Sequence, residues 1–203
     1  FKAPMAGILF TLEILLFNIS MTSILPLLMS TVTATAVSYL FLGRDVAFMS
    51  TIDPFVMKNI PYYLILGVFC GFVSLYFTRT TLTLEDKIKS IENPYKRWAF
   101  SALMLGLLIY IFPPLFGEGY HALESLLTGN PVQGLDTSLF ASLLNYKWFV
   151  PIFFLFVLIF KVFAMSFTNA GGGVGGTFGP TLIVGGIAGF VLARVINLTG
   201  VHI

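Results

Sequence analysis

Charged residues are scarce in this sequence. Only 10% of its 203 residues are charged, whereas soluble domains carry about 25%, and 57% of its residues are hydrophobic. The formal net charge of +2 is too small to indicate a nucleic-acid partner. The composition therefore excludes an ordinary soluble domain and predicts an integral membrane protein that has the lipid bilayer as its surroundings.

Cysteine and histidine are also rare, with one Cys (Cys70) and two His in the chain. One cysteine cannot form a disulfide within the chain, and two histidines argue against a structural zinc site. Glu118 and His121 leave an intramembrane enzyme open as a remote alternative, but no nucleophile–base pattern accompanies them. We therefore expect no catalytic residues, no metal and no cofactor.

Long uncharged runs are what the sequence has instead of charge. A helix needs about 20 apolar residues to cross about 30 Å of hydrocarbon. The sequence has several such runs and, besides them, two shorter segments that are predicted to be helices. Short segments with Pro or Gly among long ones are typical of channels and transporters. The predicted fold class is all-α, a polytopic membrane protein with short, tilted and re-entrant helices. Spans are predicted at 24–42, 59–78, 98–117, 146–168 and 178–193, and the short helices at 4–17 and 120–127.

The segments between the spans differ in charge. Residues 79–97 carry Lys87, Lys89 and Lys96 between two arginines, whereas 118–145 holds three acidic residues and no Lys or Arg. Basic residues concentrate in cytoplasmic segments of membrane proteins. We therefore predict that 79–97 is a cytoplasmic loop and that 118–145 is external.

Residues 169–180, NAGGGVGGTFGP, place six glycines between two apolar runs. Glycines spaced four apart, such as Gly185 and Gly189, are typical of close helix packing. The cluster at 171–176 would destabilise a helix too much for that explanation, since each glycine costs about 1 kcal/mol relative to alanine. It is better explained as non-helical backbone at membrane depth, which is tolerated only inside protein or beside a wet cavity.

The helix that follows this segment offers an anion site. Pro180 suits the first turn of that helix, so the N–H groups of Thr177, Phe178 and Gly179 are predicted to lie at its N-terminus. There the positive end of the helix dipole favours a negative ion. A nucleotide-binding P-loop is excluded because Gly176 is not followed by Lys and then Ser or Thr.

Two motifs resemble the CLC chloride channel and transporter family. The stretch 161–189 carries the family's Gly-Gly-x-Phe-x-Pro ending as Gly175, Gly176, Phe178 and Pro180. The stretch FKAPMAGILFTLE at 1–13 is similar to the family's F-N-A-P-L-A-G-x-x-F-x-x-E helix, although Lys2 replaces the usual Asn. The two motifs stand in the family's order. The residues of the second motif that match are Phe1, Ala3, Pro4, Ala6, Gly7, Phe10 and Glu13.

This resemblance implies a partial transmembrane domain over 1–203 that transports chloride or similar small anions. Thr177 and Phe178, with Gly179, carry over as main-chain anion ligands, and Gly175, Gly176 and Pro180 as residues that form the loop. The bound ion is then substrate rather than cofactor. The resemblance also implies a homodimer with one pore per subunit, in which 4–17 and 24–42 face the partner. It implies a multi-pass protein of a cell membrane, and we expect a prokaryotic inner membrane.

The transport mechanism is open between a passive channel and a proton-coupled exchanger. Proton-coupled members of the family usually have an internal Glu directly after the position of Glu13, and Ile14 stands there in this chain. Isoleucine cannot relay a proton, which slightly favours the channel. The family's gating Glu lies upstream of Phe1, so Glu13 is not that residue.

Two charged residues in apolar runs are candidates for a role in the electrostatics of the ion path or in a proton path. Charged residues inside membranes are functional candidates by default. Glu13 can reach water, pair with a lysine or act in such a path. Lys161 can pair with Glu13, cap backbone carbonyls or add positive potential along the anion path.

Overall fold

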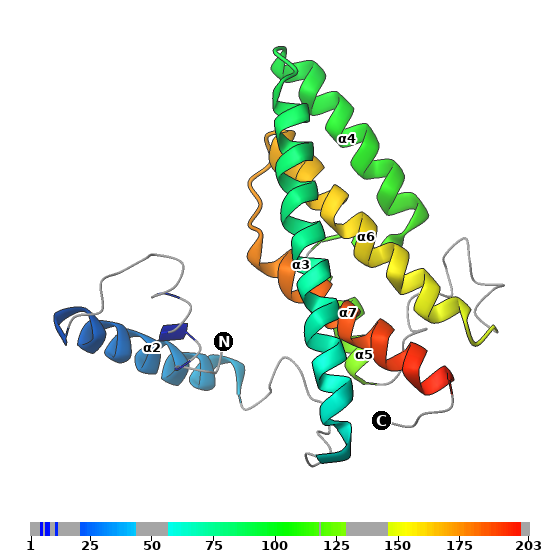
Figure 1. Cartoon of the computed structure of the whole chain (residues 1–203). Helices are drawn as coiled ribbons and strands as arrows, with labels where there is room; N and C mark the ends of the chain where they lie inside the picture. The colour runs from blue at the N-terminus through cyan, green and yellow to red at the C-terminus, as the bar shows by residue number, and fades with distance from the viewer. Residues whose placement is uncertain are drawn as a thin grey trace. The chain divides into compact units, whose positions relative to one another are not determined.

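The computed structural model describes residues 5, 7–8 and 11 and the ranges 21–43, 57–117, 119–128 and 146–199. All regular structure in these residues is helical, which confirms the predicted all-α class (Figure 1). Four of the helical segments are long and apolar enough to span a membrane. The elements are α2 (Met21–Leu42), η1 (Met57–Asn59), α3 (Ile60–Lys89), α4 (Pro94–Ile111), η2 (Pro113–Leu115), α5 (Tyr120–Leu127), α6 (Phe149–Ala170) and α7 (Phe178–Leu198).

The predicted cytoplasmic loop at 79–97 is mostly helix, which corrects the sequence-based expectation. Helix α3 continues to Lys89, and α4 begins at Pro94 behind an Asn93 N-cap whose Oδ1 accepts the N–H groups of Tyr95 and Lys96. Charged residues are compatible with a helix that extends past the membrane. The ion pair between Glu85 and Lys89, at i,i+4, stabilises this part of α3.

The span predicted in the run 98–117, with its end at Pro113 and Pro114, starts earlier than expected, at Pro94, and ends where expected. Helix α4 ends at Ile111, and Pro113 and Pro114 open the 3₁₀ turn η2. A proline has no N–H and disfavours helix in the residue before it, so the helix stops ahead of this pair.

The chain divides into two compact units, residues 1–49 and 50–203. In the first unit α2 is an apolar helix, and a Cβ added at Gly7 would lie 3.3 Å from Thr31 Cγ2. Three threonines in α2 donate their hydroxyl hydrogens to carbonyls three or four residues earlier, which is common where helices lack water. They are Thr31, Thr33 and Thr35.

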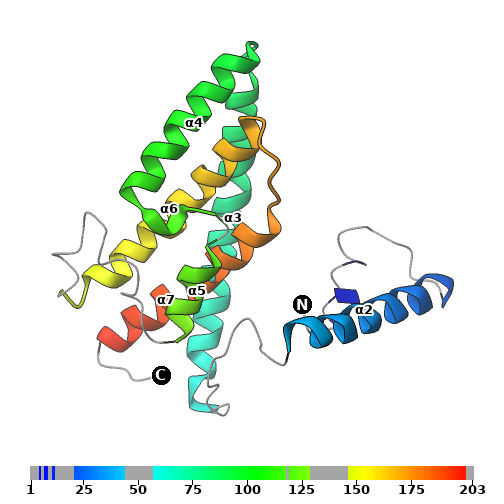
Figure 2. The ribbon, with the colours of Figure 1, turned by 180° about the vertical axis from the view of Figure 1, so that it is seen from behind.

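Helix α6 forms the centre of the second unit. It contacts α3, α4 and α7 and η2, and 61% of its span is buried within the protein. Aromatic rings fill the space around it: the Phe112 ring centroid lies 5.6 Å from that of Phe153 and 5.2 Å from that of Phe160. Short helix α5 lies against α7, as Figure 2 shows from behind.

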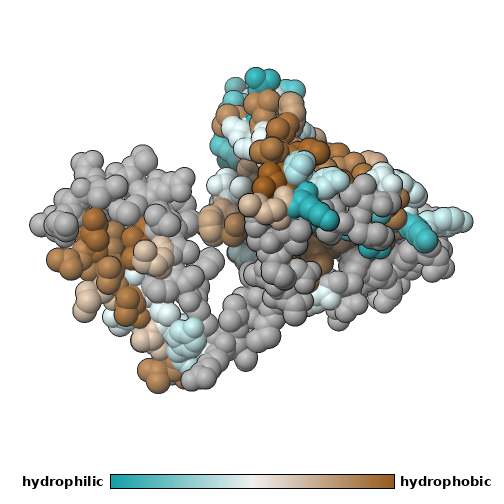
Figure 3. Space-filling view, turned by 60° about the horizontal axis from the view of Figure 1, so that its bottom comes forward, coloured by the Kyte–Doolittle hydropathy of each residue, from teal (hydrophilic) through white to brown (hydrophobic). Residues whose placement is uncertain are grey.

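The outer surface of the second unit is apolar. Large side chains along α3 and α4, such as Leu64, Phe72 and Leu103, are more than half exposed. In the space-filling view hydrophilic side chains lie at the upper end, and others lie lower on the right side (Figure 3). Exposed apolar surface with polar ends is what a protein surrounded by lipid requires.

Candidate functional site

The glycine segment begins with a tight stop to α6. The N–H of Gly173 donates to the carbonyl of Thr168 at 2.9 Å, and that of Gly172 donates to the carbonyl of Asn169 at 3.3 Å. This pair of bonds is the Schellman motif, and Gly172 takes the left-handed position in it with φ +104°. The carbonyls of Thr168 and Asn169 near the end of α6 are therefore satisfied, and the chain leaves the helix as irregular backbone.

Two other glycines permit close approach to neighbouring groups. A Cβ added at Gly171 would lie 2.7 Å from Cβ of Ser101 in α4, and one at Gly175 would lie 2.6 Å from Oδ1 of Asn169. Gly171 therefore excludes a larger residue, because the backbone carbonyl oxygen of Phe167 is also 2.7 Å away. At Gly175, in contrast, the Asn169 side chain would have to move. Gly176 differs, because a Cβ there would meet nothing within 4 Å among the described residues.

Helix α7 starts where the sequence predicted. Thr177 is its N-cap, Phe178 is its first residue and Pro180 lies in its first turn. The Thr177 hydroxyl makes no capping hydrogen bond, and the backbone carbonyl of Thr177 accepts the N–H of Thr181 at 3.0 Å. The first turn of α7 has no acidic residue. The main chain and the helix dipole thus dominate the chemistry of this helix end.

The N-terminus of α7 lies partway along the helices of the second unit, and Thr177 and Phe178 are exposed within this chain. Figures 1 and 2 show the glycine segment running back from the end of α6, so that α7 begins about midway along α3. Helix α3 has 30 residues, which at 1.5 Å per residue gives a length of about 45 Å. This is longer than the hydrocarbon of a bilayer, which is about 30 Å thick, and the second half of α3 carries charged residues, so the midpoint of α3 is not the middle of the membrane.

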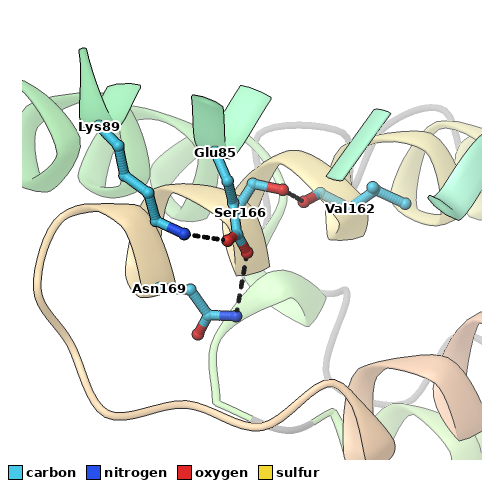
Figure 4. Close-up of polar contacts among 5 residues, drawn as sticks. All are labelled: Glu85, Lys89, Val162, Ser166 and Asn169. Carbon is cyan, nitrogen blue, oxygen red and sulfur yellow. Dashed lines mark hydrogen bonds and ion pairs between the residues drawn. The ribbon is translucent and has the colours of Figure 1, made fainter. Parts of the chain in front are cut away.

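A polar contact that the sequence did not predict borders the glycine segment. Asn169 Nδ2 lies 3.5 Å from Glu85 Oε1, and Glu85 Oε2 pairs with Lys89 Nζ at 2.7 Å (Figure 4). The i,i+4 spacing of Glu85 and Lys89 could have indicated their pair. Nothing in the sequence indicated Asn169, because its partner is 84 positions away.

The other predicted residues are distributed as follows. Lys161 is buried in α6 and donates to backbone carbonyls, one of its three predicted roles. Glu13, Ile14 and Glu118 lie outside the described residues, and of His121 the structure describes only its place in α5.

The expected close packing at Gly185 and Gly189 is not found among the described residues, where an added Cβ would meet nothing within 4 Å. The close approach is at Gly186 instead, where an added Cβ would overlap Cδ1 of Leu123 from α5. The four-residue spacing therefore identified the correct stretch of α7 but the wrong face.

A cavity of about 250 Å³ lies far along α7 from its N-terminus. It is lined by residues of η1, α3 and α7, among them Tyr62, Leu66 and Ile196. Tyrosines are typical of the membrane–water interface. Because its lining residues in α7 belong to the second half of that helix, this cavity is separate from the candidate site at the N-terminus of α7.

Comparisons with known proteins identify the family of this chain. The family model described as voltage gated chloride channel matches residues 1–203. A relative named chloride channel protein CLC-e, from Arabidopsis thaliana, is 30% identical over 98% of this chain and 28% of its own length. A relative named voltage-gated ClC-type chloride channel ClcB, from Escherichia coli, is 27% identical over 98% of this chain and 44% of its own length.

This chain therefore spans less than half the length of these curated relatives. No solved structure matches it significantly.

Proposed function

Because the chain belongs to the voltage-gated chloride channel family, we propose that its protein carries chloride and similar small anions across a membrane. The family consists of channels and transporters, so an intramembrane enzyme built on Glu118 and His121 is set aside. Both of these relatives are named as chloride channels.

One observation supports the proposal best: α7 begins midway along α3, behind a glycine segment with no charged side chain. We propose that main-chain N–H groups of Thr177, Phe178 and Gly179 bind the anion there, with Gly175, Gly176 and Pro180 shaping the loop. Amides and a helix dipole can replace part of the ion's hydration without a lysine or arginine that would hold it too tightly.

A passive channel is the slightly favoured mechanism within this proposal. Ile14 occupies the position that follows Glu13, where a carboxylate would be needed to relay a proton along that route. A proton-coupled exchanger is the alternative, with a proton path that uses another acid or water. Glu13 itself is retained as a candidate for the electrostatics of the path.

We propose further that the protein is a homodimer in a cell membrane, with a prokaryotic inner membrane as the expected location. Helix α2 is apolar along its length, so its surroundings are lipid or other helices. Its small residues, Ala34 and Ala36, allow another helix to approach closely.

The test is chloride flux from liposomes that contain the full-length protein, with chloride and internal pH recorded together. Chloride efflux with no coupled proton movement is expected for the channel. Opposite proton movement in a fixed ratio to chloride would identify the exchanger. Protein that folds but moves no anion above the rate of empty liposomes would contradict the proposal.

A further inference from the structure

Lys161 is a charged side chain in the interior of the second unit. It lies in the middle of α6 with 2% of its surface exposed. Its Nζ donates to the carbonyl of Gly117 at 2.8 Å and to that of Leu115 at 3.2 Å. These bonds join α6 to a turn 44 and 46 positions earlier in the chain.

The carbonyls that Lys161 binds belong to irregular backbone. They follow α4 at the end of η2, and Gly117 and Gly119 take positive φ values of +63° and +91°. Backbone of this kind cannot complete its own hydrogen bonds, and lipid supplies no donors. An ammonium group has three donors and forms charge-assisted hydrogen bonds, which are stronger than neutral ones.

The same turn lies against α7. A Cβ added at Gly119 would come within 3.4 Å of Ile183 Cγ2 and 3.5 Å of Lys161 Nζ. One helical turn later, Leu123 of α5 fills the space beside Gly186 of α7. Gly119 and α5 therefore pack on α7 just after the first turn of that helix, and Lys161 binds the turn that comes directly before them.

We propose that Lys161 is a positioning residue: its hydrogen bonds to the carbonyls of Leu115 and Gly117 fix the turn that leads into α5, and so hold α5 against α7, the helix whose N-terminus binds the anion. The part that concerns the anion rests on the proposed function. The contact between α5 and α7 can be measured without it.

Substitutions at Lys161 separate its role as a hydrogen-bond donor to the turn from a direct effect of its positive charge on the anion. Lys161→Arg keeps the charge and the donors, Lys161→Gln keeps N–H donors without the charge, and Lys161→Met keeps only an unbranched side chain of similar length. Lys147→Met is the matched control, because Lys147 is exposed just ahead of the same helix.

The first measurement is disulfide formation between Leu123→Cys and Gly186→Cys in the full-length protein in a cysteine-free background. Lys161→Met is expected to slow the crosslink at least tenfold, equivalent to about 1.4 kcal/mol. Lys161→Arg, Lys161→Gln and Lys147→Met are expected to crosslink at nearly the original rate. An unchanged rate in Lys161→Met would overturn the proposal. If Lys161→Met does not fold, Gly119→Ala replaces it, since an L-residue at φ +91° strains the turn that Lys161 binds. This variant must slow the crosslink too.

The second measurement is calorimetric titration of the same variants, without the added cysteines, with chloride. Chloride affinity is expected to fall together with the crosslinking rate, in Lys161→Met but not in Lys161→Gln. If Lys161→Gln crosslinks normally but binds chloride as weakly as Lys161→Met, the charge acts directly and the positioning role is wrong. If the unmodified protein binds no chloride, the proposed function fails while the crosslink still tests the contact.

Discussion

At the scale of single residues, the glycines of the segment 171–176 have different physical roles. Gly172 has φ +104° and completes the Schellman motif. Gly176 has no positive φ, and a Cβ added there would meet nothing within 4 Å among the described residues. An L-residue in left-handed conformation is strained, and alanine shows this most simply because it adds only a Cβ.

Gly172→Ala is therefore expected to lower the free energy of unfolding by about 1–2 kcal/mol, the usual penalty for left-handed backbone. Gly176→Ala is the matched control and is expected to leave stability almost unchanged. Thermal unfolding of the full-length protein in detergent measures both. Equal melting temperatures for the two variants would show that the turn at Gly172 differs from the one described here.

The nature of the anion ligands is also decided at single residues. The Thr177 hydroxyl makes no capping bond, so Thr177→Val is expected to keep chloride affinity within a factor of about ten, a loss below about 1.4 kcal/mol. Gly179→Pro removes one N–H in the first turn, where proline is tolerated. Because a hydrogen bond to a charged group contributes about 1.5–3 kcal/mol, affinity is expected to fall about 10- to 100-fold.

Gly179→Ala is the control for this comparison, since it keeps the N–H and should bind chloride nearly as well as the original protein. Calorimetric titration of each folded variant measures the affinities. Binding that is lost in Thr177→Val and retained in Gly179→Pro would make the hydroxyl, and not the main chain, the ligand.

At the scale of the elements, α3 and α4 form a helical hairpin whose turn, 90–93, is flanked by basic residues. The positive-inside rule counts such residues whether they lie in a loop or at helix ends. The orientation predicted from the sequence therefore does not depend on the loop that the structure corrected, and the turn is still predicted to face the cytoplasm.

A membrane-impermeant thiol reagent applied to intact cells tests this orientation. Ser138→Cys is expected to react, and the exposed Ser90→Cys is expected to react only after the membrane is opened. Ile88→Cys is the control near Ser90, because Ile88 is 4% exposed and should resist labelling in both conditions. Reaction of Ser90→Cys in intact cells, with none at Ser138→Cys, would reverse the topology.

At the scale of the whole molecule, the proposed homodimer predicts that α2 of one subunit lies close to its partner. Single cysteines at Val32, Val37 or Leu40, which are all exposed, are expected to give a crosslinked dimer with a short reagent in native membranes. Val157 in α6 is 1% exposed, so Val157→Cys should give none. A complete absence of dimer along 24–42 would exclude α2 from the interface.

Much of the fold could be predicted from the sequence because lipid imposes simple rules. Apolar runs of about 20 residues must be helices in a bilayer, since no other open structure satisfies its own backbone. The predicted helices at 24–42, 146–168 and 178–193 accordingly correspond to α2, α6 and α7 within a few residues. The ends of α3 and α4 were less predictable, because past the membrane the pattern of charge no longer marks where a helix stops.

The sequence by itself determined the class of the protein, its family motifs and the start of α7, because hydropathy, glycine content and proline placement act locally. Only the tertiary structure decided which partners Lys161 and Asn169 find and which glycine of α7 faces α5. Those contacts join residues 44, 46, 84 and 63 positions apart. The physical reason is that a buried donor needs an acceptor from whatever backbone folds beside it, and local sequence patterns do not specify which distant segment that is.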